Sequence, residues 1–96
     1  IMGKVPSQDL INRIKYIADN TRGAHNTHNI KVDYFGPYAT VYLHIEVNGD
    51  MTLSESHKIV HTVENNILKE IPEVKSVMVH ACPIGLTYNH DQIIDK

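Results

Sequence analysis

Hydrophobic positions along the chain follow two periods, one typical of helices and one typical of strands. Residues 28–35 and 39–47 alternate between apolar and polar side chains, as half-buried strands do. The short segment FGPY between them predicts a tight turn and hence an antiparallel hairpin. A helix is predicted from Ser7 onward and is expected to stop at Gly23. Its apolar stripe, at spacings of three and four, consists of Leu10, Ile11, Ile14, Ile17 and Ala18.

A second, longer helix and a third strand are predicted from local signals. Thr52 followed by Glu55 is a capping box, in which each side chain satisfies a backbone N–H at the start of a helix. Pro72 is expected to end that helix. A strand follows over about residues 74–82. The apolar face of the helix is expected to consist of Leu53, Val60, Val63, Ile67 and Ile71.

The predicted order α-β-β-α-β indicates one α+β domain over residues 1–96. Its core is expected over about 7–83, and residues 84–96 have no clear period and are expected to form an irregular tail. Three strands and two helices favour an antiparallel or mixed sheet with both helices on one face. If the second and third strands are parallel, the helix between them is a right-handed crossover. The uncovered face would carry Tyr42, His44, Met78, His80 and Cys82.

Composition and charge exclude some classes of function. The net charge of -2 argues against nucleic acid as the main partner. The sequence contains no run of 18 apolar residues, so we expect no membrane span. A single cysteine cannot form an internal disulfide, which fits a reducing compartment. The chain begins with Ile, so we expect a processed product or a piece of something longer. The unusual feature is histidine, which is spread over the chain at His25, His28, His44, His57, His61, His80 and His90.

Several of these histidines are predicted to converge with the cysteine. Strand alternation places His44, His80 and Cys82 on one sheet face, although each histidine alone also fits a solvated strand position. His28 and His44 are mirrored about the hairpin turn, which places them close together across the ladder. Strict alternation would nevertheless put His28 on the core face with Ile30, so its side of the sheet stays open. Imidazoles and a thiolate are ligands suited to zinc and its neighbours.

The remaining histidines give weaker signals. His57 and His61 are four residues apart and share one side of the second helix, at the edge of its apolar face. Residue 58 is Lys, so the HExxH motif of zinc proteases is not formed. His25 is expected in a polar loop. No nucleophile–base pair or paired carboxylates are visible, so we expect no enzyme activity.

Longer stretches make the sequence similar to a known family. The segments LHIEVNGDMTLSESH, VENNI and IPEVKSVMVH, preceded by the His before the first strand, resemble the C-terminal cytoplasmic domain of cation diffusion facilitator transporters over about residues 7–83. The resemblance implies a metallochaperone-like (ferredoxin-like) fold and a homodimer below a membrane domain. It also implies a site for Zn²⁺ or another divalent transition metal. The ligands that it implies are His28, His44, His57, His80 and Cys82.

Two of these ligands raise questions within the resemblance. His57 would have to reach the sheet from a helix, in one reading from the partner subunit. The family more often has an acidic residue where this chain has Cys82, so either metal preference differs or the site is lost. No role is assigned to His25, His61 or His90.

The resemblance implies a regulatory domain of a zinc-type efflux transporter, on the cytoplasmic side of the cell membrane. Metal binding would promote transport by the attached transmembrane domain. One alternative is a dimerisation module that binds no metal. Another is a free-standing domain of the metal-chaperone type.

Overall fold

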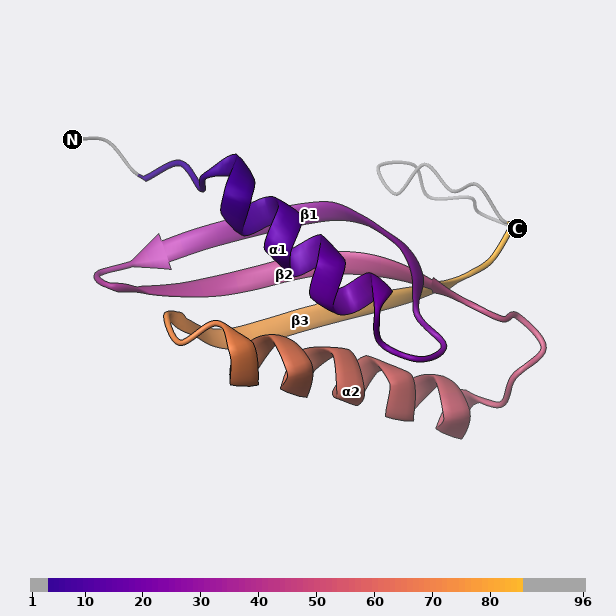
Figure 1. The fold of residues 1–96 in the computed structure, drawn as a ribbon. Helices are drawn as coiled ribbons and strands as arrows, with labels where there is room; N and C mark the ends of the chain where they lie inside the picture. Colours follow the sequence, from indigo (N-terminus) through magenta and orange to yellow (C-terminus); the bar gives the residue numbers. More distant parts are fainter. Residues whose placement is uncertain (1–3, 86–96) are drawn as a thin grey trace, which may run out of the picture.

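The predicted element order is found in the computed structural model, which describes residues 4–85 (Figure 1). The chain forms an α+β domain, which confirms the predicted fold class. Two of the strands begin earlier than expected, and the third ends one residue later. The elements are α1 (Gln8–Asp19), β1 (His25–Phe35), β2 (Tyr38–Val47), α2 (Leu53–Glu70) and β3 (Val74–Pro83).

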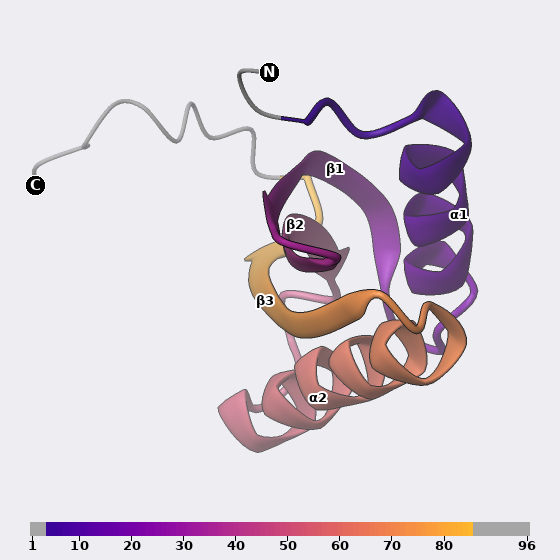
Figure 2. The ribbon, with the colours of Figure 1, turned by 90° about the vertical axis from the view of Figure 1, so that its left-hand side faces the viewer.

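The three strands form one mixed sheet in the order β1-β2-β3. β1 and β2 are an antiparallel hairpin, whereas β2 and β3 run parallel and are connected through α2. Both helices lie on the same side of the sheet, as the view in Figure 2 shows. Within residues 4–85, no helix covers the opposite sheet face, and His44 of β2 and His80 of β3 lie on this face.

The core lies between the central strand and the two helices. Val41, Leu43 and Ile45 of β2 are at most 1% exposed, and they alternate with the outward-facing residues. The predicted stripe of α1 packs against them, and so does most of the predicted face of α2. Leu53 is the exception, because it is 87% exposed. It is the first residue of α2, where helical spacing continues but the helix has not yet reached the sheet, and Ile59 is the first α2 residue that packs on the core.

The predicted N-terminal caps mark where the helices begin, whereas Gly23 does not mark where α1 ends. Thr52 Oγ1 accepts a hydrogen bond from the Glu55 N–H, and Glu55 Oε1 accepts one from the Thr52 N–H, which confirms the capping box. α1 ends at Asp19 and is capped by Asn20, so the expected stop at Gly23 is wrong. Gly23 has a φ of 91° and lies so close to α2 that a Cβ would be 2.6 Å from Ile59 Cδ1.

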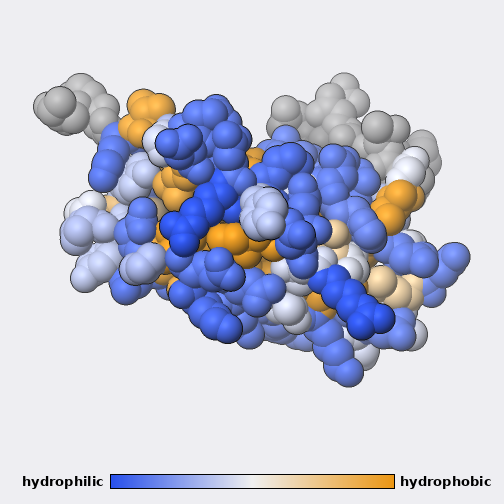
Figure 3. Space-filling model, viewed as in Figure 1, coloured by the Kyte–Doolittle hydropathy of each residue, from blue (hydrophilic) through white to orange (hydrophobic). Residues whose placement is uncertain are grey.

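Within residues 4–85, neither helix combines the length and the apolar character needed to cross a bilayer. The side that bears the helices is largely hydrophilic, with a small hydrophobic area at its centre (Figure 3). The Ile84 N–H donates to the Val47 carbonyl oxygen at 2.8 Å. Most of the expected tail, including His90, lies outside the described residues.

Candidate metal centre

His44 and His80 are neighbours across the parallel strand pair. They are Cα partners in the β2–β3 register, and their ring centroids are 4.9 Å apart. Leu43 and Ile45, on either side of His44, are buried on the helix-covered face, so the His44 ring projects from the opposite face. The fold therefore brings together two of the predicted ligands by pleat and register alone.

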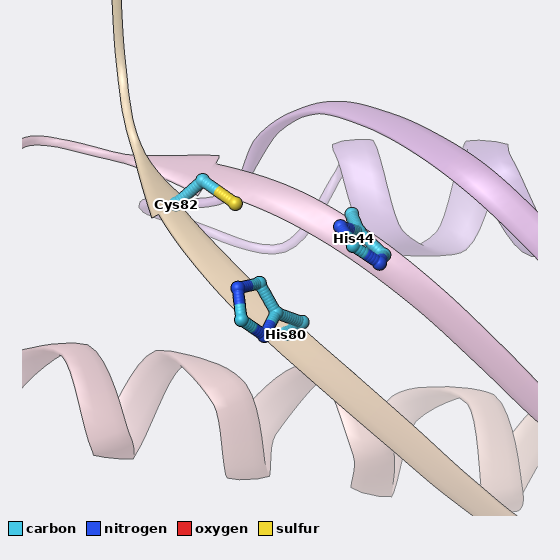
Figure 4. A group of neighbouring side chains, drawn as sticks. All are labelled: His44, His80 and Cys82. Atoms are coloured by element: carbon cyan, nitrogen blue, oxygen red, sulfur yellow. The ribbon is translucent and has the colours of Figure 1, made fainter. Parts of the chain in front are cut away.

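Cys82 completes a group of three donors on the same face (Figure 4). One ring nitrogen from each of His44 and His80 and the Cys82 Sγ all lie within 4.8 Å of one another. In a tetrahedral zinc site the nitrogen and sulfur ligands are about 3.5 Å apart, so side-chain shifts of about 1 Å would close this group around an ion. The donor types and their spacing fit a transition metal.

The cysteine is the buried member of the group. Cys82 is 5% exposed, and burial, together with the charge of Glu46, raises the pKa of its thiol. Glu46 is the Cα partner of Cys82 in the parallel register. Sequence reasoning did not name Glu46, although its alternation with His44 was a sufficient signal that it shares this face. A metal ion would bind the thiolate, so its positive charge would offset both causes of the raised pKa.

His28 lies beside this group, and the structure settles which side of the sheet it occupies. It is the Cα partner of His44, and the two ring centroids are 5.4 Å apart. Asn29, with a φ of 52°, lies in a register shift between His28 and Lys31, and the extra residue reverses the alternation. His28 Nδ1 is 2.8 Å from the Asn26 carbonyl oxygen, which places the ring proton on Nδ1 and makes Nε2 the nitrogen suited to a metal.

A hydrogen-bonded anchor holds the residue that precedes His28. Thr27 is buried, and Asp19 Oδ1 accepts hydrogen bonds from its N–H at 2.9 Å and its hydroxyl at 2.6 Å. Lys15 Nζ lies 3.1 Å from Asp19 Oδ2 and donates to the Thr27 carbonyl oxygen. Burial raises the pKa of Asp19, but the Thr27 hydrogen bonds and Lys15 outweigh it, so the net pKa is lowered. α1 therefore fixes the start of β1.

The other histidines are placed elsewhere. His57 is on α2, and its Nε2 is 2.9 Å from Nε2 of His61, so it is not part of the sheet-face group within one protomer. His25 belongs to β1, where its Cα partner is Glu46, and not to a loop as expected. Of the five predicted ligands, the fold brings three together, sets His28 next to them and leaves His57 on the helix.

The fold is that of the cytoplasmic domains of cation efflux proteins. The family model described as the cytoplasmic domain of cation efflux proteins matches residues 6–84, so the chain belongs to this family. This membership agrees with the resemblance seen in the sequence.

Curated relatives are longer than this chain. It is 35% identical over 83 residues to Protein p34 of Rickettsia rickettsii (strain Sheila Smith), covering 86% of the chain and 27% of that protein. It is 31% identical over 80 residues to an uncharacterized transporter of Methanocaldococcus jannaschii, covering 83% of the chain and 28% of the transporter. The chain thus spans about a quarter of the length of these relatives.

Solved structures share the fold. The metal-bound C-terminal domain of the CzcD transporter from Thermotoga maritima superposes with a TM-score of 0.78 at 22% identity, covering 83% of this chain and 93% of that domain. A nickel form of a MamM C-terminal domain variant gives a TM-score of 0.77 at 22% identity, covering 80% of this chain and 98% of that one. At such identities the likeness establishes the fold alone.

Proposed function

We propose that this chain is the regulatory domain of a divalent-cation efflux transporter. On this proposal it binds Zn²⁺, or another divalent transition metal, on the cytoplasmic side of the cell membrane. Binding promotes transport by an attached transmembrane domain. The observation that carries the proposal is the convergence of His44, His80 and Cys82 on the uncovered sheet face, with donor atoms within 4.8 Å of one another.

The donor set favours zinc over harder cations. Two imidazoles and one thiolate are typical zinc ligands, whereas Mg²⁺ and Ca²⁺ prefer oxygen. His28 is the nearest candidate for a fourth ligand, because its ring packs against that of His44. Glu46, beside Cys82, is a carboxylate that can orient a ligand or neutralise the ion.

The same face supports a homodimer. A shallow groove of about 250 Å³ runs over it, lined by residues that include Tyr42, His44, Met78 and His80. Met78 is 58% exposed and contributes an apolar side chain to this groove. A metal bound beside this groove would lie next to the second protomer and could draw the two together. The metal-bound state named for the Thermotoga maritima domain is consistent with this role.

Calorimetry of the metal-stripped chain with Zn²⁺ tests the site. The double variant His44→Ala with His80→Ala should lose at least about 100-fold in affinity, because outer-shell changes alone cost 10- to 100-fold. His25→Ala removes an exposed histidine of β1 and serves as the matched control. Equal Zn²⁺ affinity in the double variant and the control would refute the site.

Sedimentation of the same samples separates regulation from plain dimerisation. We expect Zn²⁺ to shift the wild-type chain towards a more compact or more stable dimer. A dimer that forms equally with and without Zn²⁺, in a chain that binds none, would replace the proposal with the metal-independent dimerisation module.

A further inference from the structure

The part of β1 that carries His28 has an irregular backbone with a period of three residues. The pairing register with β2 shifts once on each side of His28, so one extra residue is inserted into β1 at each shift. Asn26 and Asn29 lie in these two shifts and have positive φ values of 48° and 52°. After glycine, asparagine is among the residues that adopt this left-handed conformation most readily. The segment HNTHNI is therefore a repeated triplet, in which an outward histidine is followed by a left-handed asparagine and an inward residue.

Thr27, the inward residue of the first triplet, is held by α1. It is 3% exposed, and Asp19 Oδ1 accepts hydrogen bonds from its N–H at 2.9 Å and from its hydroxyl at 2.6 Å. Lys15 Nζ donates to the Thr27 carbonyl oxygen at 2.9 Å and lies 3.1 Å from Asp19 Oδ2. The N–H, the hydroxyl and the carbonyl group of Thr27 are thus all bonded to side chains of α1.

This contact stabilises the position of His28 on the open face of the sheet. His28 follows Thr27 directly, and its ring centroid is 5.4 Å from that of His44. A regular β1 would instead place Thr27 on the open face and His28 on the helix-covered face, because a shift of one residue exchanges the two faces of a strand. Two left-handed asparagines make the irregular register costly, and the hydrogen bonds of Asp19 offset that cost. Asp19 therefore favours the register in which His28 lies beside the sheet-face donors.

We propose that Asp19 is a positioning residue of the sheet-face metal site. Acting through Thr27, it keeps β1 in the register that sets His28 beside His44, so that His28 supplies the fourth ligand. The coupling is reciprocal, so a metal ion bound by His28 strengthens the contact between Thr27 and α1. Metal binding is thereby linked to α1 and not only to the sheet. The inference rests on the proposed function, because it takes the sheet-face group as the metal site.

A double-mutant cycle on Zn²⁺ affinity, measured by calorimetry of the metal-stripped chain, tests this role. Asp19→Asn should lower the affinity about tenfold, as is typical for a group that orients a ligand, and His28→Ala should lower it at least as much. In a chain that already carries His28→Ala, Asp19→Asn should change the affinity less than about twofold, because the ligand through which it acts is gone. Thr27→Ser keeps the hydroxyl and should bind like the wild type, whereas Thr27→Val should bind more weakly.

Two matched controls separate positioning from a general loss of stability or charge. Ile67→Val destabilises the core on α2, and Asp33→Asn removes an exposed carboxylate from β1. Both should leave the Zn²⁺ affinity unchanged. Circular dichroism at the titration temperature verifies that every variant is folded. With Co²⁺ in place of Zn²⁺, visible absorption reports the ligand set, and Asp19→Asn should shift the spectrum towards that of His28→Ala.

Asn29 provides a second test that leaves Asp19 intact. Asn29→Gly preserves the left-handed conformation and should bind Zn²⁺ like the wild type. Asn29→Val carries a branched side chain that disfavours positive φ, so it should weaken binding to the level of His28→Ala.

The outcomes distinguish this inference from the proposed function. The inference is overturned if Asp19→Asn lowers the Zn²⁺ affinity equally with and without His28. It is also overturned if the folded variant keeps the wild-type affinity and Co²⁺ spectrum. In both cases the proposed function stands, provided that His44→Ala with His80→Ala still weakens binding. A wild-type chain that binds no Zn²⁺ would overturn both.

Discussion

Replacement of Asp19 tests whether the contact between α1 and β1 stabilises the fold as the structure implies. Asp19→Ala removes the acceptor of two hydrogen bonds from Thr27, which is 3% exposed, and the ionic partner of Lys15. A hydrogen bond to a charged group contributes about 1.5–3 kcal/mol. We therefore expect a loss of about 2–4 kcal/mol in the free energy of unfolding, or about 10–25 °C in Tm for a domain of this size. Asp19→Asn keeps an oxygen acceptor and should lose about half as much.

The dependence on pH gives this variant a distinctive signature. The pKa of Asp19 is lowered from 3.8 in the folded state, so its contribution to stability is present above that value and is lost as pH falls through the folded pKa. Urea unfolding in the presence of chelator should show a constant difference between wild type and Asp19→Asn from about pH 5 to 7, narrowing below about pH 4. Asp33→Asn, at an exposed position of β1, should change stability by less than about 0.5 kcal/mol. A difference that is the same at pH 3 and pH 7, or no larger than that of the control, would refute the reasoning.

Three further expectations concern packing and metal choice. Gly23→Ala should lower Tm more than Gly36→Ala in thermal unfolding, because both glycines have positive φ but only Gly23 lies against another side chain; equal shifts would contradict this. In urea unfolding, Ile67→Ala should lower the free energy of unfolding by about 2–5 kcal/mol, because Ile67 is fully buried. Leu53→Ala should lower it by less than about 0.5 kcal/mol, because Leu53 is 87% exposed. Similar losses in the two variants would show that α2 packs differently. Cys82→Asp should lower the affinity for Zn²⁺ relative to Mn²⁺ in competition calorimetry, and an unchanged ratio would remove Cys82 from the site.

Much of the sheet-face group follows from the sequence because alternation is a local property. His44 lies between two buried residues of β2, and His80 and Cys82 occupy alternate positions of β3. The crossover through α2 makes β2 and β3 parallel neighbours, and the register observed in the folded sheet aligns His44 with His80. The N-terminal caps of both helices, Ser7 and Thr52, were equally predictable, since a cap and its partner are three residues apart.

What the sequence left open depends on irregular backbone and on contacts between distant segments. The side of His28 could not be read because Asn29 adopts a left-handed conformation that shifts the register, and nothing in the alternation requires this. The exposure of Leu53 depends on where α2 first meets the sheet. The hydrogen bond between Thr27 and Asp19 joins β1 to α1 across a loop, and no sequence motif predicts it.

The central claim is that the uncovered sheet face binds a metal, and the most direct test is anomalous scattering from crystals of the chain grown with Zn²⁺. We expect a peak at the zinc edge within about 2.0–2.4 Å of Cys82 Sγ and of one ring nitrogen from each of His44 and His80. A fully occupied zinc peak elsewhere, with these three side chains unchanged and no density between them, would contradict the claim.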